Sequence, residues 1–179
     1  QPPKSDQDQA MLPLNKAEQN DPSPLPQADY IRALNFPQNE TDKLGFTALR
    51  KAMRDHTTRQ LIRAAEDVLT LLSQDGIYMD DLTPKPSSTK DWRLFSQGAR
   101  GAALAGLATI QEESVLELTQ KRMREDLIFR DAAHHFLRIF DKSFMEFERQ
   151  AREDELAAFA QTRTARAFMV LGSVTGTFE

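Results

Sequence analysis

The 65 residues from Leu107 to Leu171 include neither glycine nor proline. One α-helix of that length would extend about 100 Å at about 1.5 Å per residue, far beyond the size of a small domain. The segment must therefore fold back on itself. Its apolar stripe is interrupted near Asp126 and again between Arg152 and Glu155, and we expect a helix break at each place.

Two apolar stretches in this segment are candidates for the centre of the protein. One runs from Leu156 to Leu171 and is apolar almost all round from Ala165 onward, which is typical of a central helix. The other precedes it in the sequence and has apolar residues at helical spacing: Phe129, Ala133, Phe136, Phe140, Phe144, Phe147 and Ala151.

Residues 46–75 also lack glycine and proline, but their apolar stripe changes phase. Phe46, Leu49 and Met53 define one stripe, and the apolar residues from Leu61 to Leu72 define another about a quarter turn away. A straight helix cannot bury both.

We therefore predict a break at His56, followed by a capping box. In this box Thr57 accepts from the backbone and Gln60 reaches back. The second helix is expected to end at Gly76 in a left-handed cap.

Shorter elements complete the prediction. A helix from Ala28 to Asn35 should stop before Pro37, and Ser88 can cap a helix through Trp92 to Gln97. The small-residue run from Gly101 to Gly106 is expected to be helical and buried. No stretch alternates with period two, so no sheet is predicted. The fold class is all-α, a single compact bundle of about six to seven helices over residues 27–179.

Residues 1–26 differ in composition from the rest of the chain. Prolines are concentrated in and just after them, and large apolar side chains are few. Such a segment cannot bury enough surface to offset its conformational entropy, so we predict a disordered or loosely docked arm. Its apolar residues can serve as a docking motif or belong to a featureless linker; they are Met11, Leu12, Leu14 and Leu25.

Composition excludes several classes of protein. The chain has no cysteine, which removes disulfides, thiolate nucleophiles and Cys-ligated metals. No apolar run reaches the 18 or so residues of a membrane span, and a cytoplasmic protein is expected. The chain starts at Gln1 without an initiator Met, so an upstream signal or anchor stays open.

Catalytic motifs are nearly absent. The glycines from Gly98 to Gly106 lack the Lys and Ser or Thr of a phosphate-binding loop. His134 and His135 are neighbours and point about 100° apart, so they cannot both face one metal. The sequence predicts no catalytic residue, no cofactor and no metal site, and it favours a protein that is not an enzyme.

A basic cluster stands out because the whole chain has a net charge of −4. Between Leu44 and Ala65 five basic residues face one acidic residue, a local net of +4. Together with the predicted break, this suggests a helix-turn-helix-like DNA-binding segment over residues 47–63. We keep this as an alternative; its residues are Arg50, Lys51, Arg54, Arg59 and Arg63.

Arg163 shares the stripe of the last helix, where a guanidinium has to be paired. It is expected to form a structural ion pair at one end of the bundle. A third class of function is a small-ligand site or enzyme in a bundle cavity near Arg163 and His134. In that case Arg163 would bind an anion or a carboxylate of a partner.

The hypothesis that we carry forward is a non-enzymatic interaction or regulatory module that binds another protein. Such a module should expose an apolar patch. Nine of the eleven phenylalanines follow residue 90, so we expect the apolar patch on the C-terminal half. Phe144, Phe147 or Phe178 should be exposed at the margin of that half. Core packing could equally absorb all of them.

Overall fold

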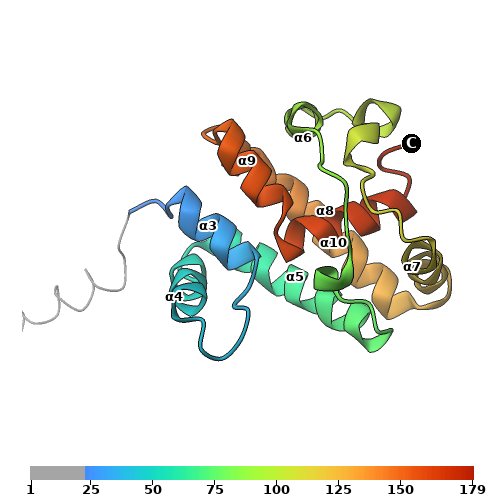
Figure 1. Ribbon diagram of the computed structural model, residues 1–179, viewed down its shortest axis with the longest axis horizontal. Coiled ribbons are helices and arrows are strands. Elements are labelled where there is room, and N and C mark those ends of the chain that lie inside the picture. The colour runs from blue at the N-terminus through green and yellow to red at the C-terminus, as the bar shows by residue number, and fades with distance from the viewer. Residues whose placement is uncertain (1–22) are drawn as a thin grey trace, which may run out of the picture.

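The structure, a computed structural model, describes residues 23–179 and is shown in Figure 1. These residues form eight α-helices and two 3₁₀ turns and contain no β-strand, which confirms the all-α prediction. The elements are α3 (Gln27–Leu34), α4 (Lys43–Ala52), α5 (His56–Gln74), η1 (Met79–Asp81), α6 (Thr89–Ser96), η2 (Gly101–Leu107), α7 (Glu113–Glu125), α8 (Leu127–Glu148), α9 (Glu153–Ala160) and α10 (Arg163–Val174).

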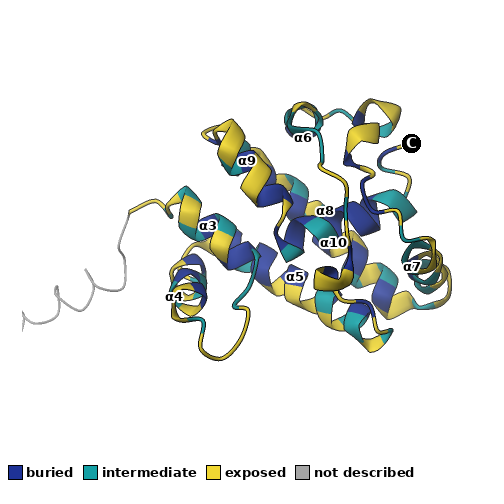
Figure 2. Ribbon diagram, in the orientation of Figure 1, coloured by how far each residue is buried: buried dark blue, intermediate teal, exposed yellow. Residues whose placement is uncertain are grey.

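Helices α5, α8 and α10 form the centre of the bundle. The long helices α5 and α8 pack along each other, and α10 contacts both of them as well as α7 and α9. Helices α3 and α4 lie together at one end, and α7 lies at the other (Figure 1). Figure 2 shows α10 as mostly buried, as predicted, and every residue from Ala167 to Gly172 is buried.

Aromatic rings fill the space between α6, α8, α9 and α10. Trp92 of α6 is fully buried against Phe140, Phe144, Phe159 and Phe168, with ring centroids between 5.3 and 6.2 Å from its own. The rings of Phe140 and Phe168 stack at 4.1 Å. The aromatic residues of the C-terminal half therefore serve the core.

The predicted break between the two stripes of residues 46–75 is present. Helix α4 ends at Ala52 and α5 begins at His56. The predicted capping box of Thr57 and Gln60 is wrong, because Asp55 is the cap and its carboxylate accepts from the Thr58 N–H at 3.0 Å. An Asp two residues before Thr57 supplies the acceptor that the helix end needs.

The breaks predicted within Leu107–Leu171 are also present. Asp126 separates α7 from α8 and caps α8, and α8 ends before the charged residues that begin α9. One further break was not predicted: Thr162 separates α9 from α10 and accepts from the Ala165 N–H. It raises the number of α-helices above the expected six or seven.

The prediction that Gly101–Gly106 is buried was wrong. This run forms the 3₁₀ turn η2, which buries Leu104 and Leu107 but leaves its alanines exposed. Positive φ at Gly101 (79°) starts the turn. Its N–H donates to the Thr177 carbonyl at 2.8 Å, which ties the C-terminal residues to η2.

The expected exposure of Phe144, Phe147 and Phe178 was also wrong. Their exposed fractions are 0%, 5% and 3%. Phe178 packs against the Phe168 ring and over Gly172, where a Cβ would lie 2.5 Å from it. The residues after α10 are therefore part of the core.

The predicted arm falls outside the described residues over positions 1–22. Of its remainder, Leu25 is partly buried and packs against the core. Helix α3 then begins at Gln27, and its Tyr30 is buried, with its hydroxyl 2.8 Å from the Ser143 hydroxyl of α8. Burial raises the pKa of Tyr30. Helix α3 is thus firmly attached to α8.

An ion pair joins the end of α5 to α7. The Arg122 Nε donates to the Asp75 Oδ2 at 2.8 Å, and a second nitrogen donates to Oδ1. This hydrogen bonding lowers the pKa of Asp75 below its ordinary value of 3.8. A proton therefore binds the unfolded chain before it binds the folded protein as the pH falls.

We expect the stability contributed by Asp75 to be complete above pH 3.8 and to decline as the pH falls through the lower folded pKa. Urea denaturation between pH 6 and pH 2 should show a shallower acid decline for Asp75→Asn than for the wild type. Asp67→Asn, an exposed carboxylate on the same helix, is the control. Identical acid slopes for Asp75→Asn and the wild type would contradict the assignment.

Candidate functional site

The five basic residues predicted for DNA binding come from α4, the turn after it and α5. Arg50 and Lys51 are exposed on α4, Arg54 is exposed in the turn that follows α4, and Arg63 is exposed on α5. Lys51 pairs with Asp29 of α3 at 3.4 Å. Helix α5 itself packs along α8 and buries the stripe that begins at Leu61.

Arg59 has a local role at the break between α4 and α5. Its Nη1 donates to the Met53 carbonyl at 3.1 Å, and its Nη2 lies 3.0 Å from the His56 Nδ1. These contacts satisfy a carbonyl at the end of α4. A base contact by Arg59 would require them to be broken.

Arg163 forms an ion pair at one end of the bundle, as the ion-pair interpretation expected. Its Nε and Nη2 donate to the two carboxylate oxygens of Asp80 at 2.9 and 2.7 Å, and its Nη1 donates to the Asn35 carbonyl at 2.9 Å. This hydrogen bonding lowers the pKa of Asp80. An anionic ligand at Arg163 would have to displace Asp80.

His134 and His135 are both exposed on α8. Over residues 23–179 no three His, Asp or Glu side chains are grouped so that they could hold a metal ion. None of the helices described is both long enough and apolar enough to cross a bilayer.

A groove opens where α4, α5 and the α3–α4 connection meet; we call it the α4–α5 groove. It has a volume of about 540 Å³, and Glu40 and Glu66 are among its lining residues. Its apolar lining comes from Phe36, Phe46, Leu49, Met53 and Ile62.

Large apolar side chains at this groove remain accessible to solvent. Phe46 is 38% exposed. Leu49 and Met53 are only partly buried. The stripe predicted for residues 46–53 is therefore only half covered by the bundle.

Phe36 holds an unusual backbone conformation at the edge of this groove. Its φ is 61°, in the left-handed region that a bulky side chain rarely adopts. Glycine is the usual residue at such a position after a helix. The Phe36 N–H donates to the Ala33 carbonyl at 3.0 Å. Backbone strain of this kind is concentrated at binding sites, which singles out this edge.

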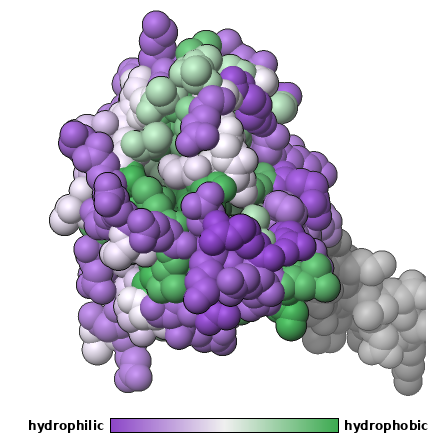
Figure 3. Space-filling model, turned by 90° about the vertical axis from the view of Figure 1, so that its right-hand side faces the viewer, coloured by the Kyte–Doolittle hydropathy of each residue, from purple (hydrophilic) through white to green (hydrophobic). Residues whose placement is uncertain are grey.

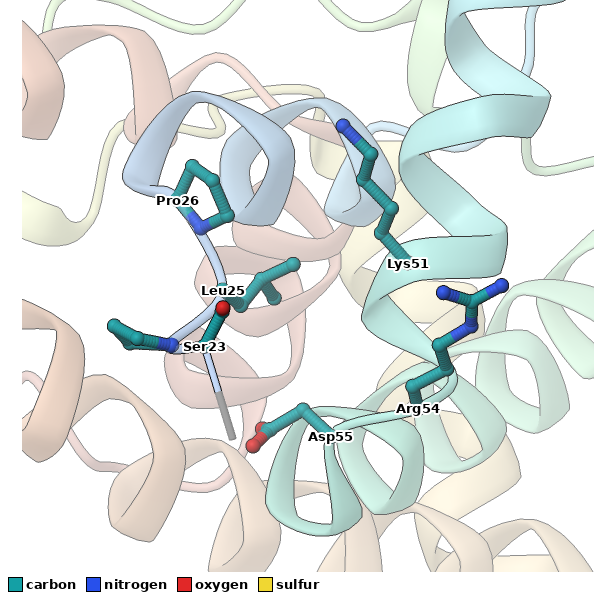
Figure 4. A pocket seen from close by; sticks show the side chains of 7 residues that line it. Ser23, Leu25, Pro26, Lys51, Arg54 and Asp55 are labelled. Atoms are coloured by element: carbon teal, nitrogen blue, oxygen red, sulfur yellow. The ribbon is translucent and has the colours of Figure 1, made fainter. Parts of the chain in front are cut away.

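A second hollow, the entry hollow, lies beside the residues where the described chain begins. It has a volume of about 510 Å³ and is lined by residues 23–26 and by Lys51, Arg54 and Asp55. Figure 4 shows Leu25 and Pro26 on one side, Lys51 of α4 and Arg54 of the turn after it on the other, and Asp55 below them. Met53 lines the α4–α5 groove and Arg54 lines the entry hollow, so the two hollows adjoin at the end of α4.

Comparison with known protein families, curated proteins and solved structures finds no match.

Exposed apolar residues also occur at the opposite end of the bundle. Leu127 and Ile128 begin α8 and are 63% and 73% exposed. Figure 3 shows that apolar atoms on this side are divided into patches by hydrophilic side chains. The α4–α5 groove differs because it combines exposed apolar side chains with a hollow that can receive another segment.

Proposed function

We propose that this protein binds a partner protein through the α4–α5 groove. The observation that carries the proposal is the half-covered stripe of Phe46, Leu49 and Met53, which lines a hollow large enough for two or three side chains. A groove of this kind gains free energy when another protein removes its apolar surface from water.

The charges at the groove define the chemistry of the partner. Glu40 and Glu66 line it together with the apolar residues. We infer that the partner contributes a short segment with two or three large apolar side chains followed closely by a Lys or Arg. The apolar side chains supply affinity, and the basic one supplies orientation.

The nucleic-acid alternative has less support. Arg59 is engaged at the break between α4 and α5, and α5 lies against α8 rather than protruding. A third alternative, a ligand site at Arg163, would have to break its pairing with Asp80.

The proposal is tested by placing a photoreactive benzoylphenylalanine at position 46 of the full chain in cells, with position 128 as the control. We expect the probe at position 46 to cross-link one identified partner. Binding of the purified partner should then weaken about tenfold or more in Phe46→Asp, because an apolar anchor is lost. Ile128→Asp should bind as the wild type does.

Two results would overturn the proposal. One is a probe at position 46 that captures no other protein. The other is a captured partner whose affinity is the same for Phe46→Asp as for the wild type.

A further inference from the structure

The first described residues lie beside one of the two hollows. Ser23 lines the entry hollow together with Lys51 and Arg54. The α4–α5 groove lies on the other side of α4, whose ten residues are about 15 Å long. The described chain therefore begins at the entry hollow, and α4 separates that hollow from the groove.

The residues before Ser23 match the two hollows in order. Nearest to Ser23 are the acidic residues Glu18 and Asp21, and the entry hollow is lined by two basic side chains and by Asp55. Further back lies an apolar cluster followed by a lysine, opposite a groove with apolar and acidic lining. That cluster is Met11, Leu12 and Leu14, and the lysine is Lys16.

The length of the chain permits this match. Ser23 lies nine positions after Leu14, and nine steps of extended chain can span up to about 30 Å. A helix with its side chains is about 10 Å across. The segment can therefore pass the end of α4 and reach the groove.

We propose that residues 11–16 of this chain occupy its own α4–α5 groove. Leu12 and Leu14 fill the apolar lining, Lys16 faces Glu40 or Glu66, and Glu18 and Asp21 face Lys51 and Arg54. Pro13 favours an extended backbone around it, in which positions 12 and 14 share a face. The segment has the same chemistry that the groove requires of a partner.

Occupation by a tethered segment regulates the groove. A short flexible tether gives an effective concentration in the millimolar range, so a weakly binding segment still competes with a partner. This competition rests on the proposed function, whereas the intramolecular contact does not.

The contact is tested with benzoylphenylalanine at position 46 of the purified full chain at low concentration. Irradiation followed by mass spectrometry should identify cross-links to residues 11–16 within the same molecule. The double variant Leu12→Ser with Leu14→Ser should lose at least four fifths of this product. The probe at position 128 should not give it.

Three outcomes would overturn the intramolecular contact. These are no cross-link from position 46 to residues 11–16, the same yield in the double variant, or a product between two copies that increases with protein concentration. The last would assign the groove to a second copy of this chain.

The partner captured in cells separates this inference from the proposed function. The double variant should bind that partner at least threefold more tightly than the wild type, because competition is removed. If the double variant binds the partner as the wild type does but Phe46→Asp still weakens binding, the regulation fails and the proposed function stands. If the intramolecular cross-link forms but no partner is captured, the intramolecular contact stands and the proposed function fails.

Discussion

Phe140→Ala should lower the free energy of unfolding by about 3–5 kcal/mol, the range for a buried phenylalanine removed from a packed core. Phe140 is 0% exposed, stacks on Phe168, and contacts the Trp92 and Phe159 rings. These ring partners come from three different helices, so they cannot all move to fill the cavity. Urea denaturation followed by circular dichroism measures the loss.

Ile128→Ala is the matched control for this substitution because it lies on the same helix and is 73% exposed. It should change the free energy of unfolding by less than about 0.5 kcal/mol. A loss under 1 kcal/mol for Phe140→Ala would show that the aromatic cluster is not the structural centre.

Phe178→Ser should have an effect of similar size although it lies one residue from the last position of the chain. Its ring is buried against Phe168 and Gly172, and the substitution leaves both a cavity and a polar hydroxyl there. We expect a loss of about 3–5 kcal/mol in the free energy of unfolding. Thermal and urea denaturation give the value.

Phe178→Leu retains most of the apolar volume and should cost less than about 1.5 kcal/mol. Gly172→Ala tests the same contact from the other side, since the added Cβ would lie 2.5 Å from the ring. If Phe178→Ser proves as stable as the wild type, the C-terminal residues do not pack as described.

The helix boundaries were largely predictable because they depend on local signals. A stripe that changes phase requires a break, and the breaks near His56, near Asp126 and before Glu153 follow from that rule. The break at Thr162 left no such signal, since Phe159, Ala160 and Ala167 continue one apolar face across it. Its cap is visible only once the Ala165 N–H is seen to donate to Thr162.

The candidate site was predictable only in part. The sequence shows the stripe of Phe46, Leu49 and Met53, but whether a neighbouring helix covers a stripe depends on tertiary packing. The number of phenylalanines after residue 90 did not predict which side chains are exposed, because a count of aromatics does not distinguish a core from a patch. Neither the left-handed backbone of Phe36 nor its place in the groove has a local sequence signal.

Trp92 is the single tryptophan of the chain, and its burial among rings from α8, α9 and α10 makes its emission a reporter of assembly. These rings lie 48 to 76 positions further along the sequence, so they meet Trp92 only when distant segments have come together. Isolated helices form in about a microsecond, whereas contacts between distant segments form more slowly. During refolding, the ellipticity of the helices should therefore recover before the indole emission shifts to the blue.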